Sequence, residues 1–290
     1  MEVYCFYSDL IYEEENWQSK CIHVEDGRFV RSHKVNPVEM VVDGFWIGPG
    51  KVYVDMEEPV YFQANSKETV KSYIDRGCTL LLCQLPVYSS QHFKRKFYQF
   101  KEKLAYLPID YMIVPRIPLP YLKTEQIRFF GRKRLPFIIV ELATEKELWK
   151  VKWEWIQQAQ SLSGIHLFFT MENNQAPDKH VLHAWKHVVD SFLISSSYEE
   201  ISHLPLPKKL LRITGISPYK GELLPQGSAD YNLFPIDKFP SIDEPEKFRY
   251  HKASPVVTVA GGKVVMANQQ VEPEIGRGYY QKVSIPRHFL

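Results

Sequence analysis

The stretch GPGKVYVDMEEP, residues 48–59, marks the point at which the pattern of the chain changes. Before it, short β-rich runs are separated by turn residues, and one of them carries the Asp26-Gly27 pair that suits a two-residue hairpin turn. From Val52 to about Ser195, strand-length apolar runs alternate with segments of helical period, which is typical of βα units around a parallel sheet. The sequence therefore predicts an α/β fold.

Six apolar runs are the predicted strands of this central block, because near-continuous hydrophobicity is typical of strands covered on both faces. They span residues 52–56, 79–85, 109–114, 136–142, 164–170 and 190–195. Segments of helical period lie between them, at residues 66–77, 89–107, 124–133, 145–164 and 178–189. Since a closed (β/α)₈ barrel needs eight strands, we expect a shortened or incomplete TIM-like (β/α) barrel.

The β-rich pattern returns after Leu206, with a short helix, a turn-rich connection and an Ala260-Gly261-Gly262 turn between two β runs. The β segments at the two ends can pair with each other, since the ends of a domain often lie close together. We therefore predict two units. Residues 1–50 and 207–290 form a small composite β-sandwich domain, and residues 51–206 form the reduced barrel domain.

The composition is that of a soluble globular protein, with 44% hydrophobic residues, 24% charged residues and a formal net charge of +2. The largest basic cluster, residues 132–134, lacks the interleaved aromatic residues of a nucleic-acid surface, so no nucleic-acid partner is expected. No apolar run approaches the roughly 20 residues that cross a bilayer, and the first residues are acidic, unlike a signal peptide. We therefore expect a cytoplasmic protein without a membrane partner.

The cysteines and histidines match no metal or redox motif. The four cysteines, at positions 5, 21, 78 and 83, lack Cys-x-x-Cys spacing and are predicted to be reduced and mostly buried. His180, His183 and His187 share one face of a predicted helix. A solvated helix face is favoured there, because three ligands at that spacing rarely close around an ion without an acid nearby.

Both ends of the chain resemble the amidohydrolase superfamily. The N-terminal segment of this superfamily is a hairpin followed by a strand that ends in a His-x-His pair. This chain resembles that segment in two stretches, HVEDGRFVR (23–31) and VVDGFWIGPGKVYVDME (41–57). The stretches ITGISPYKGELLPQGSADYNLFPID (213–237) and VVTVAGGKVVMANQQVEPEIGRG (256–278) resemble the C-terminal segments of the superfamily more closely. The likeness is to the cyclic-amide branch, which contains the dihydroorotases, allantoinases and dihydropyrimidinases.

The resemblance implies a metal-bearing barrel attached to a β-sandwich, and hydrolysis of small C–N bonds by a metal-activated water. It also implies metal ligands at positions where this chain carries other residues. The His-x-His pair falls on Asp55 and Glu57, the metal-bridging lysine falls on Ile138, and a further histidine falls on Thr170, close to Glu172. An isoleucine side chain offers no donor to a metal.

These replacements favour a pseudoenzyme that has lost its metal centre, so no cofactor is expected. Such a protein would have a binding, regulatory or assembly role, with a second copy of itself or a catalytic relative as partner. The alternative is a hydrolase of cyclic amides with a rearranged acidic site at Asp55, Glu57 and Glu172. Oxygen ligands of this kind suit Mg²⁺, Mn²⁺ or Ca²⁺ rather than Zn²⁺. Arg116, in a loop that prolines 115, 118 and 120 predict at the end of a strand, is the candidate for holding an anionic ligand.

Overall fold

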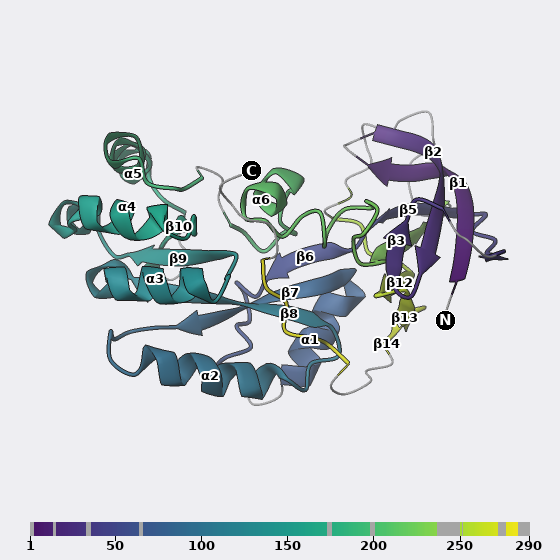
Figure 1. Ribbon diagram of the computed structural model, residues 1–290, viewed down its shortest axis with the longest axis horizontal. Helices are drawn as coiled ribbons and strands as arrows, with labels where there is room; N and C mark the ends of the chain where they lie inside the picture. Colours follow the sequence, from purple (N-terminus) through teal and green to yellow (C-terminus); the bar gives the residue numbers. More distant parts are fainter. Residues whose placement is uncertain are drawn as a thin grey trace.

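The computed structural model describes residues 3–13, 16–32, 36–63, 66–172, 176–197, 201–236, 250, 252–271 and 277–283. Two sheets organise these residues (Figure 1). A five-stranded parallel sheet lies among the helices, and a nine-stranded, mostly antiparallel sheet lies at the other end of the molecule. The predicted α/β fold is confirmed. No helix in these ranges is long and apolar enough to cross a membrane.

The parallel sheet is an open half-barrel in which five βα units follow one another. Its strands, in spatial and chain order, are β6 (Lys51–Val54), β7 (Cys78–Pro86), β8 (Asp110–Pro118), β9 (Phe137–Leu142) and β10 (His166–Met171). The helices are α1 (Ser66–Asp75), α2 (Phe93–Leu104), α3 (Thr124–Arg132), α4 (Trp153–Ser161) and α5 (Lys179–Phe192), with short 3₁₀ turns at Leu119–Tyr121 and Glu145–Lys150. Five of the six predicted strands are therefore confirmed.

The predicted sixth strand at residues 190–195 is wrong, because α5 continues to Phe192. Phe192, which is half-buried, extends the buried stripe of the helix, whose members recur at spacings of three and four: Val181, Ala184, Trp185, Val188 and Val189. Leu193 then ends the helix in the left-handed conformation, with φ of 52°. Beyond the helix, Ser196 forms an isolated parallel bridge to Leu167 of β10.

The prediction of a loop around Arg116 is also wrong, since β8 runs through Pro115 to Pro118. Arg116 pairs with Pro86 on β7 and with Ile139 on β9. The pairing with β9 begins only at Arg116, so Pro115 is not required to donate a ladder hydrogen bond on that edge.

The parallel sheet separates two hydrophobic layers. On its helix face, alternate residues such as Tyr53, Leu81 and Val140 pack in one cluster with the apolar stripes of α1 to α5. On its inner face, the intervening residues, such as Val54 and Leu82, form a second cluster. This inner layer is covered by Ile201, Leu206, Ile216 and two leucines of α6 (Lys208–Ile213). Leu210, Leu211 and Ile216 thus pack on the parallel sheet, although they lie within residues 207–290 of the predicted β-sandwich domain.

Each edge strand of the parallel sheet forms a backbone hydrogen bond with the chain between α5 and α6. Before the undescribed residues 198–200, the backbone N–H of Leu167 on β10 donates to Ser195 over 2.9 Å. After them, Leu206 donates its N–H to Val52 of β6 over 2.8 Å. Ser195 therefore lies at the β10 edge and Leu206 at the β6 edge, where each forms one backbone hydrogen bond with the edge strand.

The second sheet joins the two ends of the chain. Its strands are β1 (Val3–Glu13), β2 (Asn16–Glu25), β3 (Arg28–Val30), β4 (Val38–Glu39), β5 (Phe45–Pro49), β11 (Tyr231–Pro235), β12 (Val257–Ala260), β13 (Lys263–Ala267) and β14 (Gln270–Val271). The antiparallel pairing of β5 with β11 joins its two parts. The predicted hairpin turn is confirmed, because Asp26 and Gly27 have φ of 48° and 74°. Residues 272–276 of the resembling C-terminal stretch lie outside the described residues.

The nine-stranded sheet curls back on itself. At the β3 end, Phe29 donates its N–H to Gly227 over 3.0 Å, and Ala229 donates its N–H to Gly27 over 2.8 Å. These bonds connect β3 to the chain that leads into β11. A third apolar cluster, which includes Phe6, Val24 and Tyr231, fills the inside of the curl.

Candidate functional site

The candidate site lies where the parallel strands end. Strand alternation continues the inner face beyond its apolar layer and places four polar side chains there: Gln84, Arg116, Glu141 and Thr170, one from each of β7 to β10. We call this row the C-terminal edge of the sheet. Open and closed parallel α/β folds hold their ligands at this edge.

A charged pair lies at the centre of the C-terminal edge. Arg116 Nη2 is 2.5 Å from Glu141 Oε1, and Arg116 Nη1 donates to Gln84 Oε1 over 3.2 Å. The side chains of Arg116 and Glu141 are only 15% and 13% exposed. Burial to this degree strengthens the attraction, because fewer water molecules screen it. The three residues therefore form a fixed polar group with both donors and acceptors.

Asp55, at the end of β6, is a structural carboxylate. It is fully buried, and its two oxygens accept the backbone N–H groups of Val60 and Gln84, each over 2.8 Å. The Gln84 side-chain amide donates in turn to the backbone carbonyl of Asp55 over 2.7 Å. Burial raises the pKa of Asp55 to about 7, and the hydrogen bonds from Val60 and Gln84 oppose the rise. The carboxyl group holds the loop after β6 against the end of β7.

The other residues that the resemblance implies do not join Asp55. Glu57 is exposed and forms a 3.6 Å ion pair with Arg76. Glu172 is exposed, and Thr170 donates its hydroxyl to the carbonyl of Met171 over 3.4 Å. Ile138 belongs to the helix-face cluster, so its side chain lies on the opposite face of β9 from Glu141. Within the described residues, Asp55, Glu57 and Glu172 do not come together as a group of metal ligands.

The residues at the C-terminal edge do not fit a divalent metal. Both oxygens of Asp55 already accept backbone hydrogen bonds, and the guanidinium of Arg116 places a positive charge on the same edge. The carboxylate of Glu141 is engaged by that guanidinium. A cation would have to displace these partners to gain two or three oxygen ligands, which is unfavourable for buried groups.

A cavity of about 340 Å³ opens beside the charged pair. Arg116, Glu141 and Gln84 lie at its polar side, and the rings of Phe62 and Tyr88, both exposed, lie at its rim. Pro59 and Pro86 complete its wall. A cavity with apolar and aromatic walls and a few converging polar groups is suited to a small ligand.

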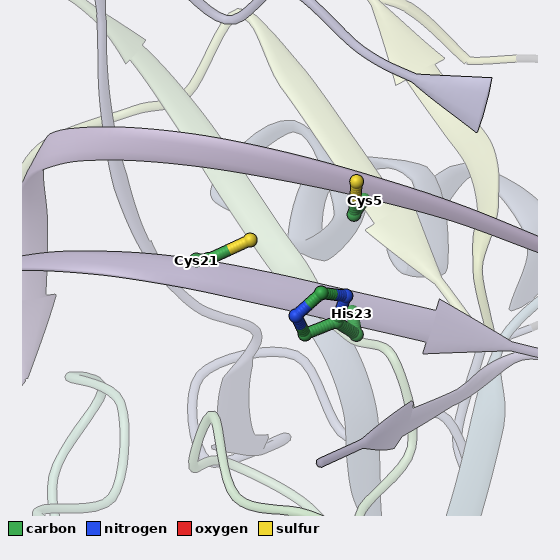
Figure 2. A group of neighbouring side chains, drawn as sticks. All are labelled: Cys5, Cys21 and His23. Carbon is green, nitrogen blue, oxygen red and sulfur yellow. The ribbon is translucent and has the colours of Figure 1, made fainter. Parts of the chain in front are cut away.

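Only one group of three potential metal ligands comes together within the described residues, and it lies elsewhere (Figure 2). It consists of Cys5, Cys21 and His23 on the nine-stranded sheet. The prediction of mostly buried cysteines is wrong for Cys21, which is exposed, and Cys5 is half-buried, whereas Cys78 and Cys83 are buried.

The three helix histidines lie on solvent-exposed positions of α5. His180, His183 and His187 are all exposed, and His187 Nδ1 lies 3.3 Å from the hydroxyl of Ser191. Within the ranges that the structure describes, they form no ligand group with an acid or a cysteine.

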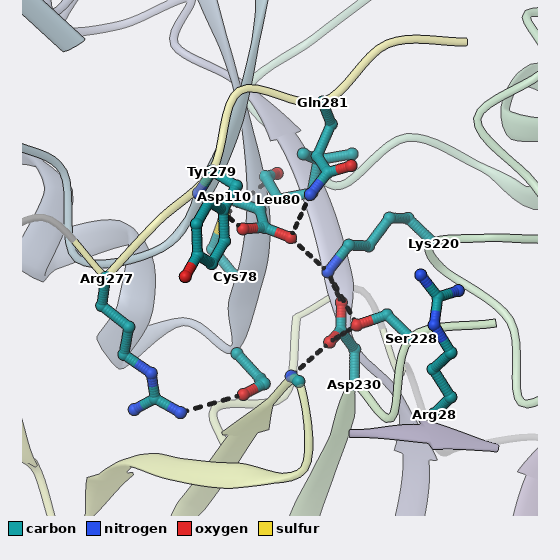
Figure 3. A network of polar contacts seen from close by, with 12 residues as sticks. Arg28, Cys78, Leu80, Asp110, Lys220, Ser228, Asp230, Arg277, Tyr279 and Gln281 are labelled. Carbon is teal, nitrogen blue, oxygen red and sulfur yellow. Dashed lines mark hydrogen bonds and ion pairs between the residues drawn. The ribbon is translucent and has the colours of Figure 1, made fainter. Parts of the chain in front are cut away.

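A buried ion-pair network lies at the opposite, N-terminal end of the parallel strands (Figure 3). Lys220 Nζ is 2.6 Å from Asp230 Oδ2, just before β11, and 2.8 Å from Asp110 Oδ2, at the start of β8. Ser228 Oγ donates to Asp230 Oδ1 over 2.6 Å, and Gln281 Nε2 donates to Asp110 Oδ2 over 2.8 Å. The network links the two sheets and borders a cavity of about 470 Å³.

The network is structural rather than catalytic. Burial lowers the pKa of Lys220, but the attraction of Asp230 and Asp110 outweighs this effect and leaves the pKa raised. The lysine is therefore held charged and paired. Residues at the N-terminal end of barrel strands contribute to stability, whereas activity belongs to the opposite end. Lys220 and Asp230, which belong to the stretch 213–237 that resembles the superfamily, thus join the two sheets.

Sequence reasoning missed two residues of the C-terminal edge, Gln84 and Glu141. Each is a polar residue near the end of an otherwise apolar run, TLLLCQL (79–85) and PFIIVEL (136–142). A polar side chain on a strand that is buried on both faces costs free energy unless it has a hydrogen-bond partner. A polar residue inside such a run is therefore the signal that could have identified both residues.

The fold of this chain is similar to that of solved cyclic-amide hydrolases, so the resemblance found in the sequence is confirmed at the level of the fold. Neither the family models nor the curated proteins give a match. Among solved structures, the chain is similar to dihydropyrimidinase from Brevibacillus agri, with a TM-score of 0.60 and 10% identity over 97% of this chain and 99% of the other.

Two further structures agree. D-hydantoinase from Thermus sp. has a TM-score of 0.60 and 12% identity, over 98% of this chain and 100% of the other. Beta-aspartyl dipeptidase from Fervidobacterium islandicum, in complex with a beta-Asp-Leu dipeptide, has a TM-score of 0.55 and 10% identity, over 94% and 99%. At such identities the likeness describes the architecture of the chain, while its chemistry depends on its own side chains.

Proposed function

We propose that this protein is an amidohydrolase-like pseudoenzyme that binds a small ligand at the C-terminal edge without hydrolysing it. In this proposal the parallel sheet is a reduced (β/α) barrel, and the curled sheet corresponds to the β-sandwich formed from both chain ends. The observation that carries the proposal is the use of both Asp55 oxygens as acceptors of backbone N–H groups. A carboxylate in this state holds a loop and is not available to a metal.

The ligand class follows from the polar groups of the cavity. The Glu141 carboxylate balances the Arg116 guanidinium, so the polar side presents donors and acceptors with little net charge. A flat ring that carries both C=O and N–H groups matches this set, and the rings of Phe62 and Tyr88 offer it apolar contact. We therefore propose a small cyclic amide as the ligand, with any carboxylate on it held by Arg116.

The test measures binding and turnover on the same samples. Dihydrouracil, hydantoin and dihydroorotate are each added to the protein with and without Mn²⁺ or Zn²⁺, and thermal stability and ring opening are followed. The expected result is a ligand-dependent rise in Tm without ring opening. Ring opening that is abolished by Asp55→Asn would overturn the proposal in favour of a hydrolase with a rearranged acidic site.

Arg116→Met is expected to weaken binding of the best ligand by about tenfold or more, because a charged hydrogen-bond donor is worth about 1.5–3 kcal/mol. It should also reduce the free energy of unfolding by about 2 kcal/mol, since it leaves the largely buried Glu141 carboxylate without its partner. Calorimetric titration and urea denaturation measure the two effects.

Two further variants make this prediction specific. Lys94→Met breaks the Lys94–Glu125 pair, which has a similar distance of 2.6 Å but side chains 49% and 60% exposed, so it should change neither quantity appreciably. Arg116→Met combined with Glu141→Gln should recover part of the stability but not the binding. Unchanged ligand affinity in both Arg116 variants would exclude this cavity as the binding site.

The proposal extends to partners. A protein that binds a ligand without converting it can act by associating with a second copy of itself or with a catalytic relative. Sedimentation of the protein with and without the bound ligand measures self-association directly, and a sedimentation coefficient that responds to the ligand would support a regulatory role.

A further inference from the structure

The outer face of the nine-stranded sheet carries a group of metal-binding side chains that has no part in the proposed function. Cys5 on β1 lies directly opposite His23 on β2, and Cys21 lies two residues before His23 on the same strand. Residues two apart on a strand share a face, as do residues directly opposite each other on paired strands. The two thiols and the imidazole therefore project from the same side of the sheet (Figure 2).

The three ligand atoms lie close to the spacing that one ion requires. The two sulfur atoms and a ring nitrogen all lie within 4.8 Å of one another. Ligands of a tetrahedral Zn²⁺ are about 3.6 Å apart, given Zn–S and Zn–N bonds of about 2.3 and 2.0 Å. A small rotation of the side chains would bring the ligand atoms from this spacing to that of a zinc site. The Cys21 side chain has room to rotate because it is exposed.

The surroundings favour a cation. On the other side of β1, Cys5 pairs in register with Glu39 of β4, so a carboxylate lies one strand away on the same face. The apolar cluster that includes Phe6 and Val24 lies on the opposite face of β1 and β2, so the sheet gives the ligands a rigid support. Half-burial of Cys5 and His23 with exposure of Cys21 gives an ion a route to the group.

We propose that Cys5, Cys21 and His23 form a binding site for one thiophilic divalent cation, of which Zn²⁺ is the best match. Two thiolates and one imidazole are a ligand set that Zn²⁺ prefers, and water completes the tetrahedron in sites with three protein ligands. The two thiols lose their protons to solvent as the metal binds, so binding releases up to two protons. The site is separate from the cavity at Arg116.

The test is titration of the reduced protein with Co²⁺, which replaces Zn²⁺ and shows thiolate-to-metal absorption when cysteines bind it. The expected result is one equivalent of Co²⁺ bound per chain, with both thiolate-to-metal and visible bands, and displacement by one equivalent of Zn²⁺. Cys5→Ser, Cys21→Ser and His23→Asn should each weaken binding by more than about 100-fold, the upper range for loss of a supporting contact around a metal.

Controls separate this site from other thiols and histidines. Cys83→Ala removes a buried thiol of the parallel sheet, and His183→Asn removes an exposed histidine of α5, so both should bind Co²⁺ as the unaltered protein does. Circular dichroism of each variant establishes that it is folded. Absence of thiolate-to-metal absorption in the reduced protein would overturn the proposal, as would its persistence in the double variant Cys5→Ser, Cys21→Ser.

Discussion

Lys220→Met is expected to reduce the free energy of unfolding by about 3–5 kcal/mol, a large part of the stability of a domain. The change leaves the Asp230 and Asp110 carboxylates without their cation, and Asp230 is buried with a side chain only 1% exposed. It also disconnects the start of β8 from the chain that enters β11. Urea denaturation followed by circular dichroism measures the loss.

A matched lysine on the same cavity provides the control. Lys263 is exposed, so Lys263→Met should change stability by no more than about 0.5 kcal/mol. If Lys220→Met does not fold, the combination with Asp110→Asn and Asp230→Asn removes the uncompensated charges and should restore folding. Equal losses for Lys220→Met and Lys263→Met would contradict a structural role for the buried network.

Asp55→Ala is expected to reduce the free energy of unfolding by about 4 kcal/mol. It removes the acceptor of two buried backbone N–H groups, those of Val60 and Gln84, and each unsatisfied group costs about 1–3 kcal/mol. Asp178→Ala offers a comparison, because Asp178 caps α5 by accepting a single N–H, that of Val181. This substitution should reduce the free energy of unfolding by about 1 kcal/mol. An Asp55→Ala loss as small as that of Asp178→Ala would show that the loop after β6 does not depend on this carboxyl group.

The same carboxyl group should make stability depend on pH. Its pKa is raised by burial to about 7, whereas in the unfolded chain it is about 3.9. Between about pH 4 and 7 the folded protein therefore binds more protons than the unfolded protein, and stability falls as the pH rises. Relative to Asp55→Asn, the wild type should lose at most about 1.4 kcal/mol per pH unit in this range, as measured by urea denaturation at several pH values. A difference that increases with pH would show instead that the hydrogen bonds keep the carboxylate ionised.

The arrangement of the parallel sheet was predictable because each strand carries its own signal. The runs at residues 79–85 and 136–142 are apolar on both faces, and the segments between them have helical period. The failure at residues 190–195 has a simple cause. Apolar residues near the end of a helix stripe look like a short strand, and only the preceding stripe from Val181 distinguishes the two.

The row at the C-terminal edge was only partly predictable. Arg116 was identified by its place near the end of a strand, but its partner Glu141 lies 25 residues further along the chain. That pairing depends on β8 and β9 being neighbours, with Pro118 opposite Glu141. The role of Asp55 was missed for a related reason, because the N–H groups that it accepts belong to residues 5 and 29 positions away.

The cysteine and histidine group was hidden by an irregularity in the pairing of β1 with β2. Near the hairpin end the paired residues are Glu13 with Asn16, but between Ser8 and Ile11 the register shifts by one residue. Without this shift Cys5 would lie opposite Val24, and a shift of one residue moves side chains to the other face. No local sequence signal specifies such a shift, so the opposition of Cys5 and His23 required the structure.

The pairing of β5 with β11 has a consequence for the order in which the protein folds. It joins residues 45–49 to residues 231–235, across a sequence distance that includes every strand and helix of the parallel sheet. Closing so large a loop is entropically unfavourable until the intervening chain has become compact. The βα units, whose contacts are local, should therefore form early. The nine-stranded sheet should form in a later and slower kinetic phase.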